Sequence, residues 1–150
     1  MSITILKKYL KSLNTANEKV VEVGYISGDK GGDAYPSGIT VAQNAAIHEF
    51  GLGNVPPRST LKTPFEVKKK EMSKFVEKQY QAVANGLEAE IALGRIGVKA
   101  QSLVQGSFTT KGYGTWPDIK EETKEAKGST QILIDRGILR QSVTWKVVKK

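Results

Sequence analysis

Residues 41–51 read VAQNAAIHEFG, and the turn Pro56-Pro57-Arg58 follows them after a short spacer. Thr40 can cap a helix that starts directly after it, because its hydroxyl can accept a hydrogen bond from an N–H of the first turn. Gly51 predicts that this helix ends just before it, since glycine readily adopts the left-handed conformation that terminates helices. The two prolines then require extended backbone. This stretch therefore predicts a helix over 41–50 followed by a stiff turn.

A second informative stretch lies far along the chain, where residues 133–143 read LIDRGILRQSV. Gly137 predicts a turn after a short apolar run that includes 132–134. Residues 139–143 then lead into a final strand over 144–148, in which Trp145 and its apolar neighbours alternate with polar residues.

The rest of the chain alternates helical patterns with one further strand. Apolar residues recur every three or four positions in the predicted helices, whereas the strand is β-branched and alternating. The glycine-rich loop or hairpin is expected to be mobile. The predicted helices cover 3–14, about 63–85 with Ser59 or Thr63 as the cap, 87–105 and, after Asp118, 119–126; the strand covers 19–27, and the loops cover 28–38 and 106–116.

Strands near both ends with helices between them predict an α+β fold. We expect a small antiparallel sheet with helices packed on one face, a long helix pair in the middle of the chain, and the long loop or hairpin. The length predicts a single domain over residues 1–150. Gly94 and Gly97, inside a predicted helix, are expected where another backbone approaches closely.

Composition excludes several classes of protein. The chain has no cysteine, so it has neither disulfides nor thiolate metal sites, which fits folding in a reducing cytoplasm. It begins with no signal-peptide pattern and contains no apolar run long enough for a membrane helix, so no membrane partner is expected. The net charge of +8 favours DNA, acidic proteins or anionic lipid without choosing among them. A basic contact surface is predicted at local concentrations of lysine, with an ordinary solvated surface as the alternative: Lys68, Lys69, Lys70, Lys146, Lys149 and Lys150.

The sequence contains no catalytic signature. His48-Glu49 begins like the zinc motif His-Glu-x-x-His, but Leu52 occupies the second histidine position and the chain has no other histidine. No nucleophile elbow accompanies His48, and residues 28–32 lack the lysine and hydroxyl residue of a phosphate-binding loop. We therefore predict no catalytic residue, no metal and no cofactor, and expect His48 to bond backbone at a helix end.

Two residues in rigid surroundings have more than one interpretation. Arg58 follows two prolines, so it is predicted either to pair with a carboxylate of its own chain, such as Glu49, or to contact a neighbouring subunit. Trp116 precedes Pro117 in a loop, where it either fills the core or anchors a partner.

These stretches together resemble the tail-component and virion-morphogenesis proteins of bacteriophages. Those proteins share a helix ending in Ala-x-x-(His)-Glu-(Phe/Tyr)-Gly, a Pro-Pro-Arg turn, and a closing Leu-x-Asp-Thr-Gly-x-Leu-x-x-Ser-Ile motif. Here Arg136 replaces the usual threonine and Val143 the isoleucine, and the order and spacing of the pieces agree over nearly all of the chain after residue 20. The residues that match the family motifs, and that are candidates for an interface, are His48, Glu49, Phe50, Gly51, Pro57, Arg58, Trp116, Gly137, Leu139 and Ser142.

The resemblance implies a structural, non-enzymatic virion protein that acts in tail completion or head–tail joining. It implies a protein made in the host cytoplasm that is monomeric before assembly and forms a ring, commonly sixfold, in the tail or neck. Its partners would be copies of itself, other phage tail or neck proteins and, without specificity, passing DNA. Two alternatives remain: a basic nucleic-acid-binding module, and a hydrolase built around His48.

Overall fold

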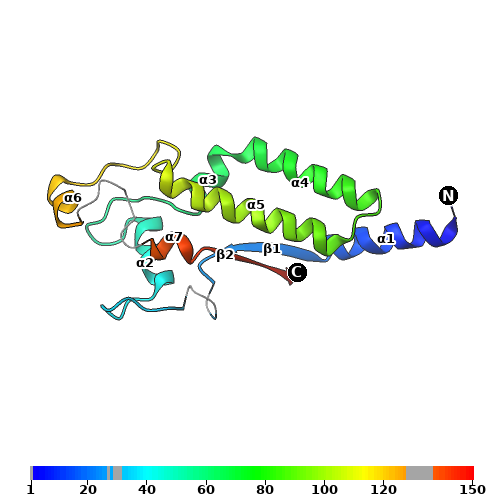
Figure 1. Ribbon diagram of the computed structural model, residues 1–150, viewed down its shortest axis with the longest axis horizontal. Coiled ribbons are helices and arrows are strands. Elements are labelled where there is room, and N and C mark those ends of the chain that lie inside the picture. The colour runs from blue at the N-terminus through cyan, green and yellow to red at the C-terminus, as the bar shows by residue number, and fades with distance from the viewer. Residues whose placement is uncertain (1, 27, 29–31, 128–136) are drawn as a thin grey trace. The chain divides into compact units, whose positions relative to one another are not determined.

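The computed structural model describes residues 2–26, 28, 32–127 and 137–150. It confirms an α+β fold in which helices pack on a two-stranded antiparallel sheet (Figure 1). Within the described residues the elements are α1 (Ile3–Asn17), β1 (Lys19–Gly24), α2 (Val41–Phe50), α3 (Lys62–Val67), α4 (Lys69–Ala84), α5 (Ala89–Thr109), α6 (Glu121–Lys127), α7 (Ile138–Gln141) and β2 (Thr144–Lys149).

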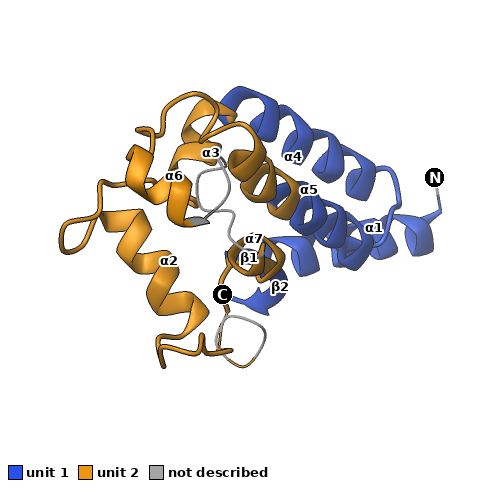
Figure 2. Ribbon diagram, turned by 60° about the vertical axis from the view of Figure 1, so that its left-hand side comes forward, with its two compact units in different colours: residues 1–23, 69–100, 145–150 blue, residues 24–68, 101–144 orange. Residues whose placement is uncertain are grey.

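The contacts of the chain fall into two compact units, each built from separate segments (Figure 2). Unit 1 comprises Met1–Val23, Lys69–Ala100 and Trp145–Lys150, and unit 2 comprises Gly24–Lys68 and Gln101–Thr144. Neither unit is one continuous segment, because the chain passes between them several times. The single domain over residues 1–150 stays a prediction.

Unit 1 contains most of the sheet and the helix pair α1 and α4. The backbone N–H of Lys150 donates to the carbonyl of Glu18 at 2.9 Å, which extends the pairing of β1 with β2. Helix α1 packs on α4, where the Tyr80 hydroxyl donates to the carbonyl of Ala16 at 3.3 Å. Small and aliphatic side chains make up the core of this unit: Ala16, Val83, Ala89, Ala92, Leu93, Ile96 and Ala100 are buried.

The two glycines of α5 lie beside a side chain, not beside another backbone as expected. A Cβ at Gly97 would be 2.3 Å from the indole of Trp145, and one at Gly94 would be 3.6 Å from the same ring. Trp145 is on β2, and its ring packs against the helix surface that Gly97 leaves free of a side chain. The two glycines correctly predicted that another group lies close to the helix, but that group is an aromatic ring.

Unit 2 has an aromatic core. Phe108, fully buried, and Trp116 meet edge to face, with ring centroids 5.7 Å apart and planes at 88°. The indole N–H of Trp116 donates to the carbonyl of Ser59 at 3.0 Å. Because Trp116 is only 7% exposed, the prediction that it fills the core is confirmed.

Several predicted boundaries move. The single helix expected over 63–85 is two helices, because the backbone at Lys68 leaves helical geometry between α3 and α4. Helix α1 continues beyond the expected end at residue 14, and α5 continues to Thr109 into the segment expected as a loop. The first strand ends earlier than expected, and Ala34, within the expected loop over 28–38, forms an antiparallel bridge with Thr40 just beyond it. The apolar run 132–134 and residues 135–136 of the closing motif lie outside the described residues.

Candidate functional site

Helix α2 and the turn after it form a rigid corner of unit 2. Thr40 caps the helix as predicted, through a reciprocal pair of hydrogen bonds with Gln43. Gly51 ends it in the left-handed conformation, at φ +66°. A Cβ at Gly51 would be 2.9 Å from the ring of Pro57, so the turn folds back tightly on the helix end. The N–H of Arg58 then donates to the carbonyl of His48 at 2.7 Å.

The Glu49 carboxylate organises the start of α3. One oxygen accepts the backbone N–H of Thr60 at 2.6 Å and that of Leu61 at 2.9 Å, and the other accepts the N–H of Lys62 at 3.0 Å. The Ser59 hydroxyl also donates to Glu49 and accepts the N–H of Thr63 at 3.1 Å. An acid from α2 therefore caps α3 by satisfying N–H groups that a helix start leaves unpaired. Ser59 assists it, as one of the two predicted caps.

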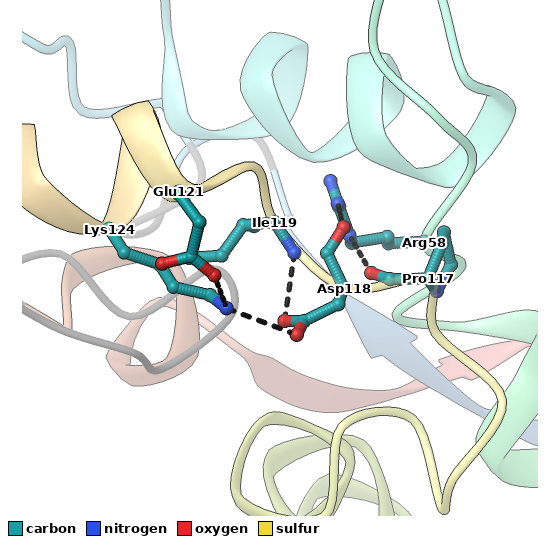
Figure 3. Close-up of polar contacts among 6 residues, drawn as sticks. All are labelled: Arg58, Pro117, Asp118, Ile119, Glu121 and Lys124. Carbon is teal, nitrogen blue, oxygen red and sulfur yellow. Dashed lines mark hydrogen bonds and ion pairs between the residues drawn. The ribbon is translucent and has the colours of Figure 1, made fainter.

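Arg58 does not pair with Glu49, so that prediction is wrong. The Glu49 carboxylate accepts hydrogen bonds from backbone N–H groups, and the Arg58 guanidinium binds other partners. Its Nε donates to the carbonyl of Pro117 and its Nη2 to the carbonyl of Asp118, both at 2.8 Å (Figure 3). Arg58 is 5% exposed, so its own chain covers most of it, and the alternative of a contact with a neighbouring subunit stays a prediction. Burial lowers the pKa of this guanidinium, and the nearby Asp118 partly opposes the shift.

Asp118 directs its own carboxylate away from Arg58. Its oxygens accept the N–H of Ile119 at 2.9 Å and the ammonium of Lys124 at 3.3 Å, while Lys124 also pairs with Glu121 at 2.7 Å (Figure 3). The Ile119 N–H, and then Lys124, hold the pKa of Asp118 below its usual range. Hydrogen bonds to Glu121, first, and to Asp118 raise the pKa of Lys124. The prediction that Asp118 caps a helix from Ile119 is wrong, because α6 begins at Glu121 and its first turn is closed by the carbonyl of Lys120.

A pocket of about 750 Å³ opens in unit 2 beside these groups. Helices α2 and α7 pack together next to it, which brings the two informative stretches of the sequence to one place. His48, Arg58 and Leu139, which were singled out as motif residues, all line it. The other lining residues come from α2, α6, α7 and the loops between them, and the sequence indicated no common site for them: Tyr35, Pro36, Asn44, Asn54, Val55, Pro56, Asp118, Ile119, Lys120, Thr123 and Ile138.

The remaining motif residues do not line the pocket. Phe50 is 72% exposed, at the end of α2. Gly137 adopts the left-handed conformation at φ +71°, which confirms the predicted turn. Ser142 is buried, and its hydroxyl donates to the carbonyl of Ile138 at 2.8 Å.

The predicted basic residues have varied surroundings. The Lys68 ammonium lies 5.3 Å from the centre of the Tyr113 ring, and Lys146 pairs with Glu22 at 3.2 Å. Lys69, Lys70, Lys149 and Lys150 are exposed. Their joint role as a contact surface stays a prediction.

Within the described part of the chain, no cluster of three or more histidine, cysteine or acidic residues could hold a metal ion. Nor does any described helix combine the length and apolarity needed to cross a membrane. No known protein family, curated protein or solved structure matches this chain.

Proposed function

We propose that this chain is a structural bacteriophage virion protein that acts in tail completion or head–tail joining. The observation that supports it best is the meeting of the two motif stretches in unit 2, where α2 packs on α7. The motif residues there each stabilise this part of the fold: Glu49 caps α3, Gly51 and Pro57 form the corner, and Leu139 is buried. Such contacts are what we expect of a sequence motif that specifies one local fold.

An exposed aromatic at the corner supports an assembly role. Phe50 and Leu52 are 72% and 51% exposed, although the backbone between them is held tightly by Gly51 and Pro57. A large apolar side chain on rigid backbone loses little entropy on binding, which suits it as an interface anchor. The proposed ring would use a heterologous contact, in which this corner meets a different face of the next copy. The chain would be monomeric until it meets the particle.

The exposed lysines suit a position close to DNA or to an acidic neighbouring ring. Lys69 and Lys70 on α4, with the C-terminal lysines, would supply a screened attraction that does not read bases. Reversal of these charges should lower particle assembly. If the charge-reversed variants assembled normally, these lysines would have no part in assembly.

The decisive experiment is to inactivate this gene in the phage that carries it and to supply the protein from a plasmid. Without the protein, electron microscopy should show tails that are detached from heads or of uncontrolled length, together with a loss of infectious particles. Phe50→Ser should reduce the yield of complete particles without lowering protein stability. The control is Val98→Ser, which removes another apolar side chain that is 57% exposed, on α5. Normal particles in the absence of the protein would refute the proposal.

The basic composition favours a second candidate, a nucleic-acid-binding module, because the net charge is +8. That function predicts tight binding of duplex DNA by the purified protein, with an affinity that falls steeply between roughly 50 and roughly 200 mM salt. The assembly role predicts weak binding throughout this range. A hydrolase built around His48 is the third hypothesis, and unchanged particle yield with His48→Gln would argue against it.

A further inference from the structure

The pocket of unit 2 contains a buried positive charge that the described residues do not neutralise. Arg58 is 5% exposed and lines the pocket, yet no described carboxylate forms an ion pair with it. Two backbone carbonyls use its Nε and Nη2. Its Nη1 has no hydrogen-bond partner among the described residues. The carboxylate of Asp118, whose charge acts on Arg58, is engaged with Ile119 and Lys124 (Figure 3).

A structural role explains only part of this arrangement. The two carbonyl contacts tie the loop at residues 117–118 to the turn after α2, and a neutral side chain with N–H donors could do the same. Neutral carbonyls satisfy hydrogen bonds, but they do not cancel a charge removed from water, and a buried charge without a counterion is costly. An anion bound in the pocket would neutralise this charge.

The surroundings indicate which anion fits. Apolar walls come from Pro56, Ile119 and Leu139, and the pocket is of a size that holds small organic groups. The Asn44 amide, which donates to the Tyr35 hydroxyl at 3.3 Å, adds a polar group to the lining. The carboxylate of Asp118 also lies at the pocket and disfavours a doubly charged ligand such as phosphate.

We infer that this pocket binds a carboxylate carried on an apolar group, with the Arg58 guanidinium as its counterion. Arginine and carboxylate form charge-assisted hydrogen bonds that are strongest when the surroundings exclude water. The group can come from a free small carboxylate or from an acidic side chain next to an apolar residue in another protein. The inference rests on Arg58 and the pocket, so it holds whether or not the chain builds phage particles.

A titration of the isotope-labelled, full-length protein with hydrocinnamate, followed by NMR, tests the inference. Its neutral analogue hydrocinnamide has almost the same shape and serves as the control ligand. Hydrocinnamate should shift the backbone signals of Asn44, Ile119 and Leu139 and bind at least about tenfold more tightly than the amide. Equal binding of the two, or shifts confined to other parts of the chain, would overturn the inference.

Variants separate the pocket from general surface charge. Ile119→Trp should fill the pocket while leaving Arg58 in place, and it should weaken hydrocinnamate binding by about tenfold or more with the NMR spectrum still that of a folded protein. Arg95→Gln removes one exposed positive charge on α5 and should bind as the wild type does. Arg58→Lys retains the charge but loses the forked geometry, and should bind more weakly. Undiminished binding by Ile119→Trp would place the anion elsewhere and refute the pocket.

A peptide distinguishes the two sources. Acetyl-Leu-Glu-Phe-amide should bind more tightly than hydrocinnamate if the natural ligand is an acidic side chain of another protein, and less tightly if it is a free carboxylate. Either order supports a carboxylate site, whereas failure of both probes to bind refutes it.

Discussion

The carboxylate of Glu49 accepts the backbone N–H of Thr60 at 2.6 Å and thereby ties the end of α2 to the start of α3. The same side chain accepts the N–H groups of Leu61 and Lys62. Replacing it by glutamine should destabilise the protein by about 1–3 kcal/mol, because the amide NH2 cannot accept and faces backbone donors. Urea unfolding measures the change. Glu66→Gln, which alters an exposed acid that pairs with Lys62, should stay within about 0.5 kcal/mol of the wild type. Equal effects of the two substitutions would deny Glu49 its capping role.

The two glycines of α5 provide a matched pair. Gly97→Ala should destabilise the protein by about 1–3 kcal/mol, because the new methyl group would overlap the Trp145 ring, 2.3 Å away. Gly94→Ala places its methyl group at an ordinary 3.6 Å from the same ring and should stabilise the helix by up to about 1 kcal/mol. Thermal unfolding of both variants checks the opposite signs. A stable Gly97→Ala variant would mean that Trp145 is free to move aside.

Gly112 and Gly114 separate backbone strain from packing in the turn before Trp116. Both have positive φ, +65° and +83°, so alanine at either position should cost about 1–2 kcal/mol. At Gly112 the methyl group would also be 2.2 Å from the Trp116 indole, whereas at Gly114 it would meet nothing. Gly112→Ala should therefore be the more destabilising by about a further 1–3 kcal/mol in chemical denaturation. If the two variants unfold alike, Trp116 is not held as the structure shows.

The contacts of Asp118 make a pH-dependent contribution to stability. Its pKa in the folded protein lies below that of the unfolded chain, about 3.9, so the unfolded state binds the proton first as the solution is acidified. Its stabilisation is therefore complete above that value and is lost as the pH falls through the lower, folded pKa. When the free energy of unfolding is measured from pH 7 down to acid, it should fall less between about pH 4 and pH 2 for Asp118→Asn than for the wild type. Parallel curves would show that the Ile119 and Lys124 contacts do not persist in solution.

Local signals in the sequence were sufficient for much of the fold. Thr40 and Gly51 predicted both ends of α2, because capping and the left-handed backbone are properties of single residues and their immediate neighbours. Gly137 predicted its turn for the same reason. The alternating pattern after Lys19 located the first strand, although not its end. The break at Lys68 had no such signal, since no glycine or proline marks it.

The candidate site depended on long-range contacts that no spacing encodes. Glu49 and Arg58 both carried the expected charges, but the sequence paired them with each other. The tertiary structure instead offers Glu49 a row of unpaired N–H groups and offers Arg58 two carbonyls some sixty residues away. Electrostatic attraction is not specific to one partner, so geometry and desolvation decide which partner a buried charge obtains. By itself the sequence determined both ends of α2, the turn at Gly137 and the presence of a strand near each end of the chain. Only the tertiary structure decided that His48, Arg58 and Leu139 line one pocket with a buried guanidinium, because that depends on which distant segments pack together.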